Sequence, residues 1–209
     1  MLAIVPRAGP PVAQGGAATL GGVFLRENEI GRRVAPWVHP GMRLLDVGSG
    51  TGLISRWLAR ERGVEPTTSD LVEFGNRVGD LPFRRIEDPV RVPAADGEFD
   101  AVMMLFVLHH MPVWDDQVRL LRDAARAASR RLIVIEDTPL HRVDRAFNVA
   151  WDWALNLRHG VPTPFTFRDV RGWSEVFADL GLRAGHVETY RAWWPTLGTY
   201  HHTLFVLDT

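Results

Sequence analysis

The chain has 209 residues, of which 46% are apolar and 23% charged, and its formal net charge is -1. This length suits one domain with a real core, and the near-zero charge argues against nucleic acid or an anionic membrane as the main partner. The absence of cysteine excludes disulfides, thiolate metal sites and a cysteine nucleophile. No stretch reaches the roughly 18 apolar residues of a membrane span, and no secretory signal is recognisable. We therefore predict a single cytoplasmic domain over residues 1–209.

Strands and helices are predicted to alternate after an irregular start. Residues 1–22, rich in Ala, Gly and Pro, are predicted to be a flexible arm, and residues 25–38 a helix that ends before Pro40-Gly41. Apolar runs predict strands at residues 43–47, 64–69, 83–87, 99–105 and 131–136. Helical spacing predicts helices at residues 53–62, stopped by Gly63, and 115–128. This alternation indicates a parallel sheet with helices on both faces.

The pattern changes beyond residue 137. Two long helices are predicted at residues 143–158 and 167–180, followed by strands at 183–189 and 201–207. No internal repeat and no linker interrupts the chain. The whole sequence therefore indicates one α/β domain with irregular insertions near its start and before its last strand.

The segment between the first strand and the next helix is rich in glycine and reads Asp46-Val47-Gly48-Ser49-Gly50-Thr51-Gly52. Glycines at alternate positions permit a tight turn and, having no Cβ, let a ligand lie against bare backbone. The helix that follows offers free N–H groups and a positive dipole end to a carboxylate or phosphate. Because open α/β sheets bind ligands at the carboxyl ends of their strands, we predict a ligand site here.

Two families of nucleoside-binding proteins use such a turn. The dinucleotide fingerprint is Gly-x-Gly-x-x-Gly, whereas here the last glycine comes one position early and Asp46 precedes the first. This arrangement resembles the class I S-adenosylmethionine-dependent methyltransferases, and the resemblance extends over roughly residues 25–137. It implies a Rossmann-like three-layer α/β/α sandwich, with a mostly parallel seven-stranded sheet and an antiparallel last strand. It also implies transfer of a methyl group from S-adenosylmethionine to a small-molecule acceptor by in-line displacement.

Further positions match the cofactor-binding residues of that family. Asp70, at the predicted end of the second strand, would grip the ribose, since a carboxylate can accept both hydrogen bonds of a diol. Asp88 would approach the adenine amino group. Pro89 has no N–H for the backbone contact to adenine that is common in the family, so either the register is shifted to make Glu87 the contact, or that hydrogen bond is absent. The cofactor contacts that the resemblance implies are Asp46, Gly48, Ser49, Gly50, Gly52, Asp70, Leu71, Asp88 and Phe106.

Two histidines follow the fourth strand, in the segment Phe106-Val107-Leu108-His109-His110-Met111. The family carries a similar hydrophobic segment ending in histidine, close to the sulfonium and the substrate entrance. Histidine has a pKa suited to taking a proton from a hydroxyl. His110 is therefore the candidate general base, with His109 behind it, and a packing or hydrogen-bonding role is the alternative.

Other histidines and acids give weaker signals. His141 is a second candidate base, and Glu136, Asp137 and His141 lack a diagnostic metal-ligand spacing, so we expect no metal. His201 and His202 lie in a predicted strand, where successive side chains point to opposite faces. Only one of these two can therefore face a cavity.

Six of the eight tryptophans lie at or beyond residue 114, in the half that builds the acceptor pocket of the family. Aromatic walls suit an apolar or planar substrate, or a cation held over a ring. Core packing accounts for most of them, and Trp114 and Trp194 are the candidate pocket residues. Residues 138–209 are thus predicted to supply the acceptor-pocket elements.

Three alternatives stand beside the main hypothesis. A nicotinamide-dependent oxidoreductase is disfavoured by the misplaced third glycine. A non-catalytic adenosylmethionine-binding protein would carry the same turn. An RNA or protein methyltransferase is disfavoured by the near-neutral charge and by the lack of an Asn-Pro-Pro-Tyr-like segment after the fourth strand.

Overall fold

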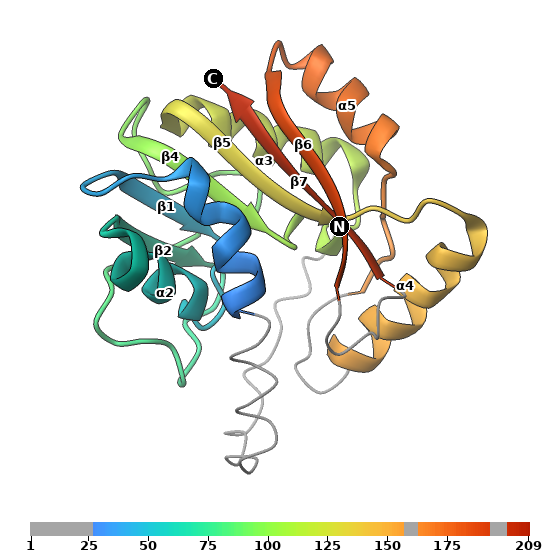
Figure 1. Ribbon diagram of the computed structural model, residues 1–209, viewed down its shortest axis with the longest axis horizontal. Helices are drawn as coiled ribbons and strands as arrows, with labels where there is room; N and C mark the ends of the chain where they lie inside the picture. The colour runs from blue at the N-terminus through green and yellow to red at the C-terminus, as the bar shows by residue number, and fades with distance from the viewer. Residues whose placement is uncertain (1–26, 157–162, 193–199) are drawn as a thin grey trace.

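The computed structural model describes residues 27–156, 163–192 and 200–209 (Figure 1). The predicted arm at residues 1–22 lies outside them. The first half of the chain comprises a helix at residues 27–34, the short turn η1 (Ala35–Trp37), β1 (Arg43–Val47), α2 (Leu53–Arg62), β2 (Glu65–Asp70), β3 (Phe83–Arg85), β4 (Phe99–Leu105), η2 (Leu108–His110), α3 (Trp114–Ala127) and β5 (Ala128–Asp137). The second half comprises α4 (Arg142–Asn156), α5 (Val170–Asp179), β6 (Arg183–Ala192) and β7 (Tyr200–Asp208).

Each predicted element is present, and the bounds differ where local chemistry sets them. Gly63 ends α2 in the left-handed conformation, as the sequence predicts. The helix α5 begins at Val170 because Asp169 caps it, accepting a hydrogen bond from Gly172 N at 2.7 Å. The strand β5 begins earlier than predicted, since α3 passes directly into extended backbone at Ala128.

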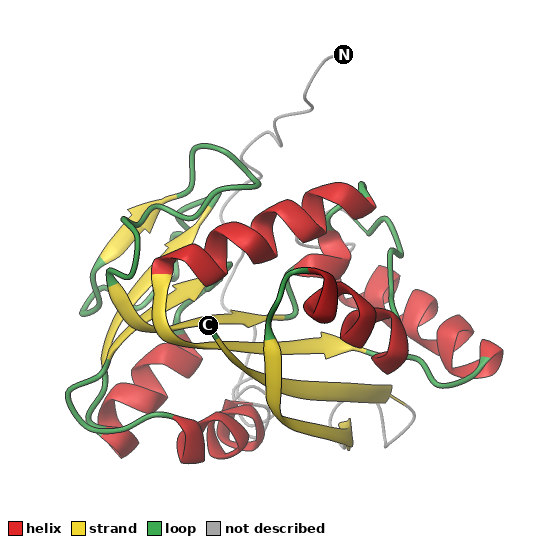
Figure 2. Cartoon of the chain, turned by 90° about the horizontal axis from the view of Figure 1, so that it is seen from above, coloured by secondary structure: helices red, strands yellow, loops and turns green. Residues whose placement is uncertain are grey.

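The sheet has seven strands in the order β3-β2-β1-β4-β5-β7-β6. The pairs β1–β2, β1–β4, β2–β3 and β4–β5 are parallel, whereas β7 runs antiparallel to both β5 and β6. Helices lie above and below the strands (Figure 2). This is the mostly parallel sheet with an antiparallel last strand that the resemblance implied, and the prediction of fold class is confirmed.

Two apolar clusters fill the space between the sheet and its helices. One packs Leu121 of α3 and the fully buried Trp173 and Phe177 of α5 against one face of the sheet. The other packs Val34 of the helix at residues 27–34 and Leu58 of α2 against the opposite face. Burial of apolar surface on both faces fixes the central strands, and their carboxyl ends therefore meet at one stable edge.

That edge carries the glycine turn and the histidine segment. The strands β1, β2, β4 and β5 are parallel neighbours, and Val47 pairs with both Ser69 and Met104. Residues that follow these strands therefore gather in one place although they are far apart in the sequence. No helix within the described ranges is both long enough and apolar enough to cross a bilayer.

Candidate functional site: a glycine cradle and a buried histidine

The turn after β1 is held open by three glycines with positive φ, at 70° for Gly48, 55° for Gly50 and 75° for Gly52. A Cβ at Gly48 would lie 2.6 Å from the Val107 side chain, and one at Gly52 would lie 2.9 Å from Val78. A Cβ at Gly50 would meet no atom within 4 Å. Glycine at 48 and 52 is thus required by packing, whereas Gly50 faces open space.

Two polar groups border this open space. The Asp70 carboxylate accepts from Gly50 N at 2.9 Å and from Val72 N at 3.4 Å, and burial raises its pKa although these hydrogen bonds oppose the shift. A carboxylate has about four acceptor positions, so Asp70 keeps capacity for a ligand. The Ser49 hydroxyl is buried and has no hydrogen-bond partner within the described part of the chain, as expected of a group that meets a bound ligand.

Asp46 lies beneath the turn. It is buried and accepts a hydrogen bond from Ser55 Oγ in the first part of α2 at 2.6 Å. Burial raises the pKa of Asp46 to about 7, and the nearby Asp70 carboxylate adds to the effect. Asp46 therefore joins β1 to α2 and sets the shape of the turn.

The predicted adenine side of the site is more exposed. Leu71 is exposed beside Asp70, as are Glu87 and Asp88 beyond β3. Asp88 accepts a hydrogen bond from Val90 N at 3.1 Å, which closes a turn around Pro89. The second oxygen of the Asp88 carboxylate remains available, so the turn has room for a contact from this residue.

These features fit the nucleoside cofactor that the sequence resemblance implies. The open backbone at Gly50, the unpartnered hydroxyl of Ser49 and the acceptor capacity of Asp70 lie together at the carboxyl end of β1. Of these three groups only Asp70 is ionisable, and its carboxylate can accept hydrogen bonds from hydroxyl groups. This site, which we call the glycine cradle, is formed by Gly48, Ser49, Gly50 and Asp70. It therefore suits a ribose and its attached chain better than a pyrophosphate.

The chain leaves β4 through a strained residue. Phe106 has a φ of 61°, which is uncommon for a bulky side chain, and its ring packs edge-on against His202 at 4.7 Å. Oε1 of the buried Glu136 accepts the next two backbone N–H groups, from Val107 at 2.9 Å and Leu108 at 2.7 Å. Glu136 thus holds the segment that faces the glycine turn.

His109 lies within a buried group of carboxylates. Its Nδ1 is 2.6 Å from Glu136 Oε2, and its Nε2 is 3.8 Å from Asp137 Oδ2 and 3.9 Å from Asp152 Oδ1. Burial disfavours the charged imidazolium, but the negative charges of Glu136, Asp137 and Asp152 outweigh it and raise the pKa of His109 to about 9. His109 is therefore protonated at neutral pH and cannot take a proton from an acceptor.

His110 is placed differently. It is only partly buried, and its ring centroid is 4.1 Å from that of His109. Ligand-type atoms of His109, His110 and Asp152 lie within 4.8 Å of one another, but a metal would have to displace the proton of His109. The expectation of no metal accordingly stays a prediction, and His110 is the histidine of this pair that an acceptor could reach.

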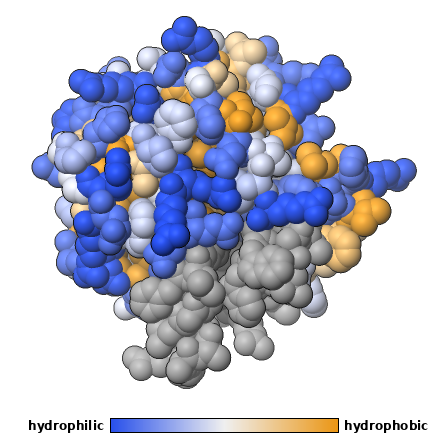
Figure 3. Space-filling view, in the orientation of Figure 1, coloured by the Kyte–Doolittle hydropathy of each residue, from blue (hydrophilic) through white to orange (hydrophobic). Residues whose placement is uncertain are grey.

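The helix α4 turns its polar side towards these histidines. Asp144, Asn148 and Asp152 are spaced four residues apart, Asn148 and Asp152 are buried, and Asp152 approaches His109. Large residues on α4 are exposed instead, namely Val143, Phe147 and Trp153, and hydrophobic surface is visible over this helix at the right of Figure 3. A surface helix ordinarily does the reverse, so α4 is built to present polar groups to the site.

Sequence reasoning missed the residues that hold the histidine segment. Thr166 Oγ1 lies 2.9 Å from His109 O and 2.8 Å from Met111 O, and Gln117 Nε2 donates to Leu108 O at 2.9 Å. No local pattern marks Thr166. The four-residue spacing of Asp144, Asn148 and Asp152, in contrast, is visible in the sequence and predicts a polar stripe.

The remaining predicted residues are spread over several places. His202 Nδ1 is 2.6 Å from Asp137 Oδ1, whereas His201 Nδ1 faces Asp144 at 3.4 Å, so the two contact different partners. His141 and Trp114 border a separate hollow, and Trp173 belongs to the core. Trp194 lies outside the described residues.

Comparison with known proteins agrees with this geometry. A family model described as a methyltransferase domain matches residues 25–187, which is more than half of the chain. The chain therefore belongs to the methyltransferase domain family, within the class I S-adenosylmethionine-dependent methyltransferases, and this prediction is confirmed.

Particular relatives can be stated by their names. The chain is 30% identical, over 127 residues, to a ubiquinone/menaquinone biosynthesis C-methyltransferase of Bordetella avium, covering 56% of this chain and 48% of the relative. It spans less than half the length of the curated relatives it matches. Its fold is similar to a SAM-dependent methyltransferase from Methanosarcina mazei, with a TM-score of 0.65 at 16% identity, covering 85% and 96% of the two chains. It is also similar to magnesium protoporphyrin IX methyltransferase from Synechocystis with bound SAH, with a TM-score of 0.62 at 17% identity, covering 94% and 89%.

Proposed function

We propose that this protein binds S-adenosylmethionine at the glycine cradle and transfers its methyl group to a small-molecule acceptor. The single observation that carries the proposal is the open space over Gly50, bordered by the Asp70 carboxylate and the unpartnered Ser49 hydroxyl. Family membership supports the cofactor, and the quinone and porphyrin enzymes among the similar proteins support a small acceptor.

Different residues of the cradle would contact different parts of the cofactor. Gly48, Ser49 and Gly50 would contact its amino-acid part through their exposed backbone and the serine hydroxyl. Asp70 would accept the ribose hydroxyls, Leu71 would cover the adenine ring, and Asp88 would accept its amino group. Asp46 and Gly52 would act from below, by fixing the turn.

The cofactor supplies, when bound, an electrophilic methyl group on a sulfonium leaving group. The protein then has to hold the acceptor in line behind that methyl group and exclude water. Phe106 and His110 lie on the segment that faces the cradle, and His110 is partly exposed whereas His109 is buried and protonated. We therefore assign His110 to removing a proton from the acceptor, and His109 to positioning this segment.

The cofactor assignment is tested by titration calorimetry with S-adenosylhomocysteine and with NAD. We expect S-adenosylhomocysteine to bind and NAD not to bind, and Asp70→Ala to weaken S-adenosylhomocysteine by about tenfold or more, because hydrogen bonds to a charged group contribute about 1.5–3 kcal/mol. Asp179→Ala, which changes an exposed carboxylate at the end of α5, is the matched control and should leave the affinity unchanged. Binding of NAD alone would contradict the proposal.

The role of His110 is tested by turnover. Release of S-adenosylhomocysteine is followed at saturating cofactor, with phenols, a hydroquinone, amines and carboxylic acids as acceptors. For an acceptor that turns over, His110→Ala should lower kcat by about a hundredfold, the usual contribution of a general base. An unchanged kcat would remove His110 from proton transfer, and cofactor binding without turnover of any acceptor would favour a non-catalytic binding protein.

A further inference from the structure

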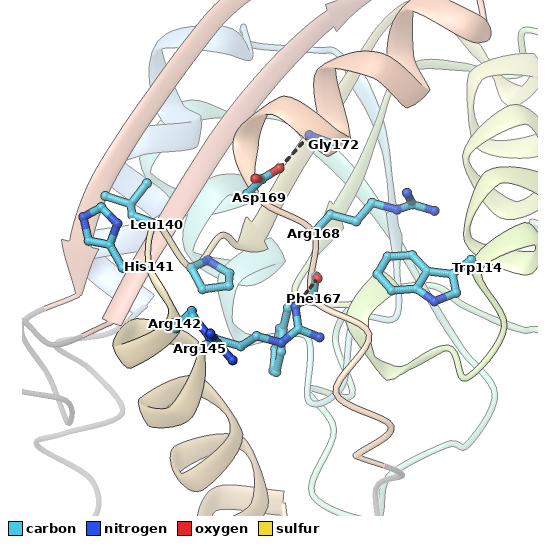
Figure 4. Close-up of a pocket in the computed structure, with 10 residues that line it drawn as sticks. Trp114, Leu140, His141, Arg142, Arg145, Phe167, Arg168, Asp169 and Gly172 are labelled. Carbon is cyan, nitrogen blue, oxygen red and sulfur yellow. Dashed lines mark hydrogen bonds between the residues drawn. The ribbon is translucent and has the colours of Figure 1, made fainter.

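A hollow of about 700 Å³ lies between the start of α3, the start of α4 and the segment that enters α5 (Figure 4). Its lining includes three arginines, Arg142 and Arg145 from α4 and Arg168 from the segment before α5. No residue of the glycine turn lines it. Phe167 closes it off from the histidine segment, since its buried ring lies at the wall of the hollow and stacks on His109 with ring centroids 5.3 Å apart. The hollow is therefore a different site from the cradle.

Neutral acceptors hold two of these guanidinium groups in place. Arg145 donates to the backbone oxygens of Phe165 at 3.3 Å and Phe167 at 3.2 Å. Arg168 Nε donates to Gln117 Oε1 at 3.1 Å, and its guanidinium lies 4.2 Å from the centre of the Trp114 ring. Such contacts fix the direction of a guanidinium without neutralising it, so the fork that recognises an oxyanion is already ordered before a ligand arrives.

The charge of the hollow is not balanced by its own residues. Within the described ranges, Arg142, Arg145 and Arg168 form no ion pair, whereas nearby Arg171 of α5 pairs with Glu175 at 3.0 Å. Among the described residues of the lining, the one carboxylate belongs to Asp169, which accepts a hydrogen bond from Gly172 N as the cap of α5. Three cations thus face a single carboxylate that is already engaged.

Neighbouring carboxylates do not remove this excess. Asp115 acts on Arg168 only through its charge, without a hydrogen bond between them. The carboxylate of Asp144 on α4 is already engaged, since it accepts from Leu140 N at 3.2 Å and lies 3.4 Å from His201 Nδ1. The hollow therefore keeps a net positive charge and draws an anion from solvent.

We propose that this hollow is a second binding site, for a small organic anion whose carboxylate or phosphate is held by Arg142, Arg145 and Arg168 and whose flat apolar body lies against Trp114. Arginine forks match both oxyanions in a bidentate manner. Trp114 is exposed within the lining and offers apolar surface beside the charge of Arg168, the combination typical of sites for small organic ligands. This second site is additional to the methyl-transfer site, and the proposal does not depend on methyl transfer.

The test is calorimetry of the full chain with 2-naphthoate, 1-naphthyl phosphate and the uncharged 2-naphthamide. We expect both anions to bind and the amide to bind at least tenfold more weakly, because only the anions engage the guanidinium groups. The double variant Arg145→Gln/Arg168→Gln should lose at least tenfold in affinity for the anions. Arg171→Gln/Arg183→Gln, which changes two arginines outside the hollow, is the matched control and should stay within about twofold.

A third variant is needed because the double variant could lose anion binding by unfolding. Arg145 and Arg168 also donate hydrogen bonds to backbone oxygens and to Gln117. Arg142→Gln breaks no hydrogen bond of the described residues, and it should weaken the anions about threefold or more while S-adenosylhomocysteine binds as to the wild type. The proposal is overturned if the anions and the amide bind equally, if Arg142→Gln and the double variant both leave anion affinity unchanged, or if neither anion binds at about 5 mM.

Discussion

The Glu136→Gln variant should unfold with a free energy lower than that of the wild type by on the order of 3 kcal/mol at pH 7. Glutamine can still accept the hydrogen bonds of Val107 N and Leu108 N, but it removes the charge 2.6 Å from the buried His109. The imidazolium then stays buried with weaker compensation from Asp137 and Asp152. Urea unfolding measures the difference, and Glu98→Gln is the control, because its pair with Arg84 is partly exposed and contributes less than about 1 kcal/mol.

The pH dependence of stability distinguishes the contribution of the His109 charge from that of its packing. The pKa of His109 is raised in the folded state to about 9, from an ordinary value of 6.5. Its stabilisation is therefore fully present below about pH 6.5 and is lost as the pH rises through about 9. Asp46 does not contribute to the change in stability over this pH range. Its raised pKa lies near 7, so the effect of its ionisation on stability is complete above that pH. A wild type whose stability stays flat from about pH 7 to 10 would contradict the assigned charge of His109.

Gly50→Ala should abolish most binding of S-adenosylhomocysteine while leaving the protein folded. The backbone there has a φ of 55°, which costs alanine about 1–2 kcal/mol, and the new methyl group would meet no protein atom within 4 Å. It would instead occupy the space assigned to the cofactor. We expect the affinity, measured by calorimetry, to fall by at least tenfold, since overlap with a single methyl group displaces the ligand from the backbone of the turn.

Gly41, at the other end of β1, provides a matched control. It has a φ of 78° and also no atom within 4 Å of an added Cβ, but it precedes β1 instead of following it. Gly41→Ala should therefore lower stability by a similar amount and leave S-adenosylhomocysteine binding unchanged. Equal affinity of the two variants would show that the space over Gly50 is not the cofactor site.

Much of the fold could be predicted because its signals are local. The strand β1 and the helix α2 coincide with their predicted bounds, since a short apolar run and a glycine stop mark them in the sequence. The strand β4 was equally clear, being apolar almost throughout. The short strand β3 was predicted two residues too long, because its register is set by pairing with β2 and by the turn at Asp88.

The candidate site divides in the same way. The sequence by itself determined the glycine turn, the acid after β2 and the two histidines after β4, because each depends on residue types at fixed spacing next to a strand end. Only the tertiary structure decided that Asp46 lies under the turn, that His109 is enclosed by Glu136, Asp137 and Asp152, and that His110 is the more accessible of the two histidines. These properties arise from β5 and α4, which are distant in the sequence, and burial among distant charges sets a pKa in a way that no local pattern records.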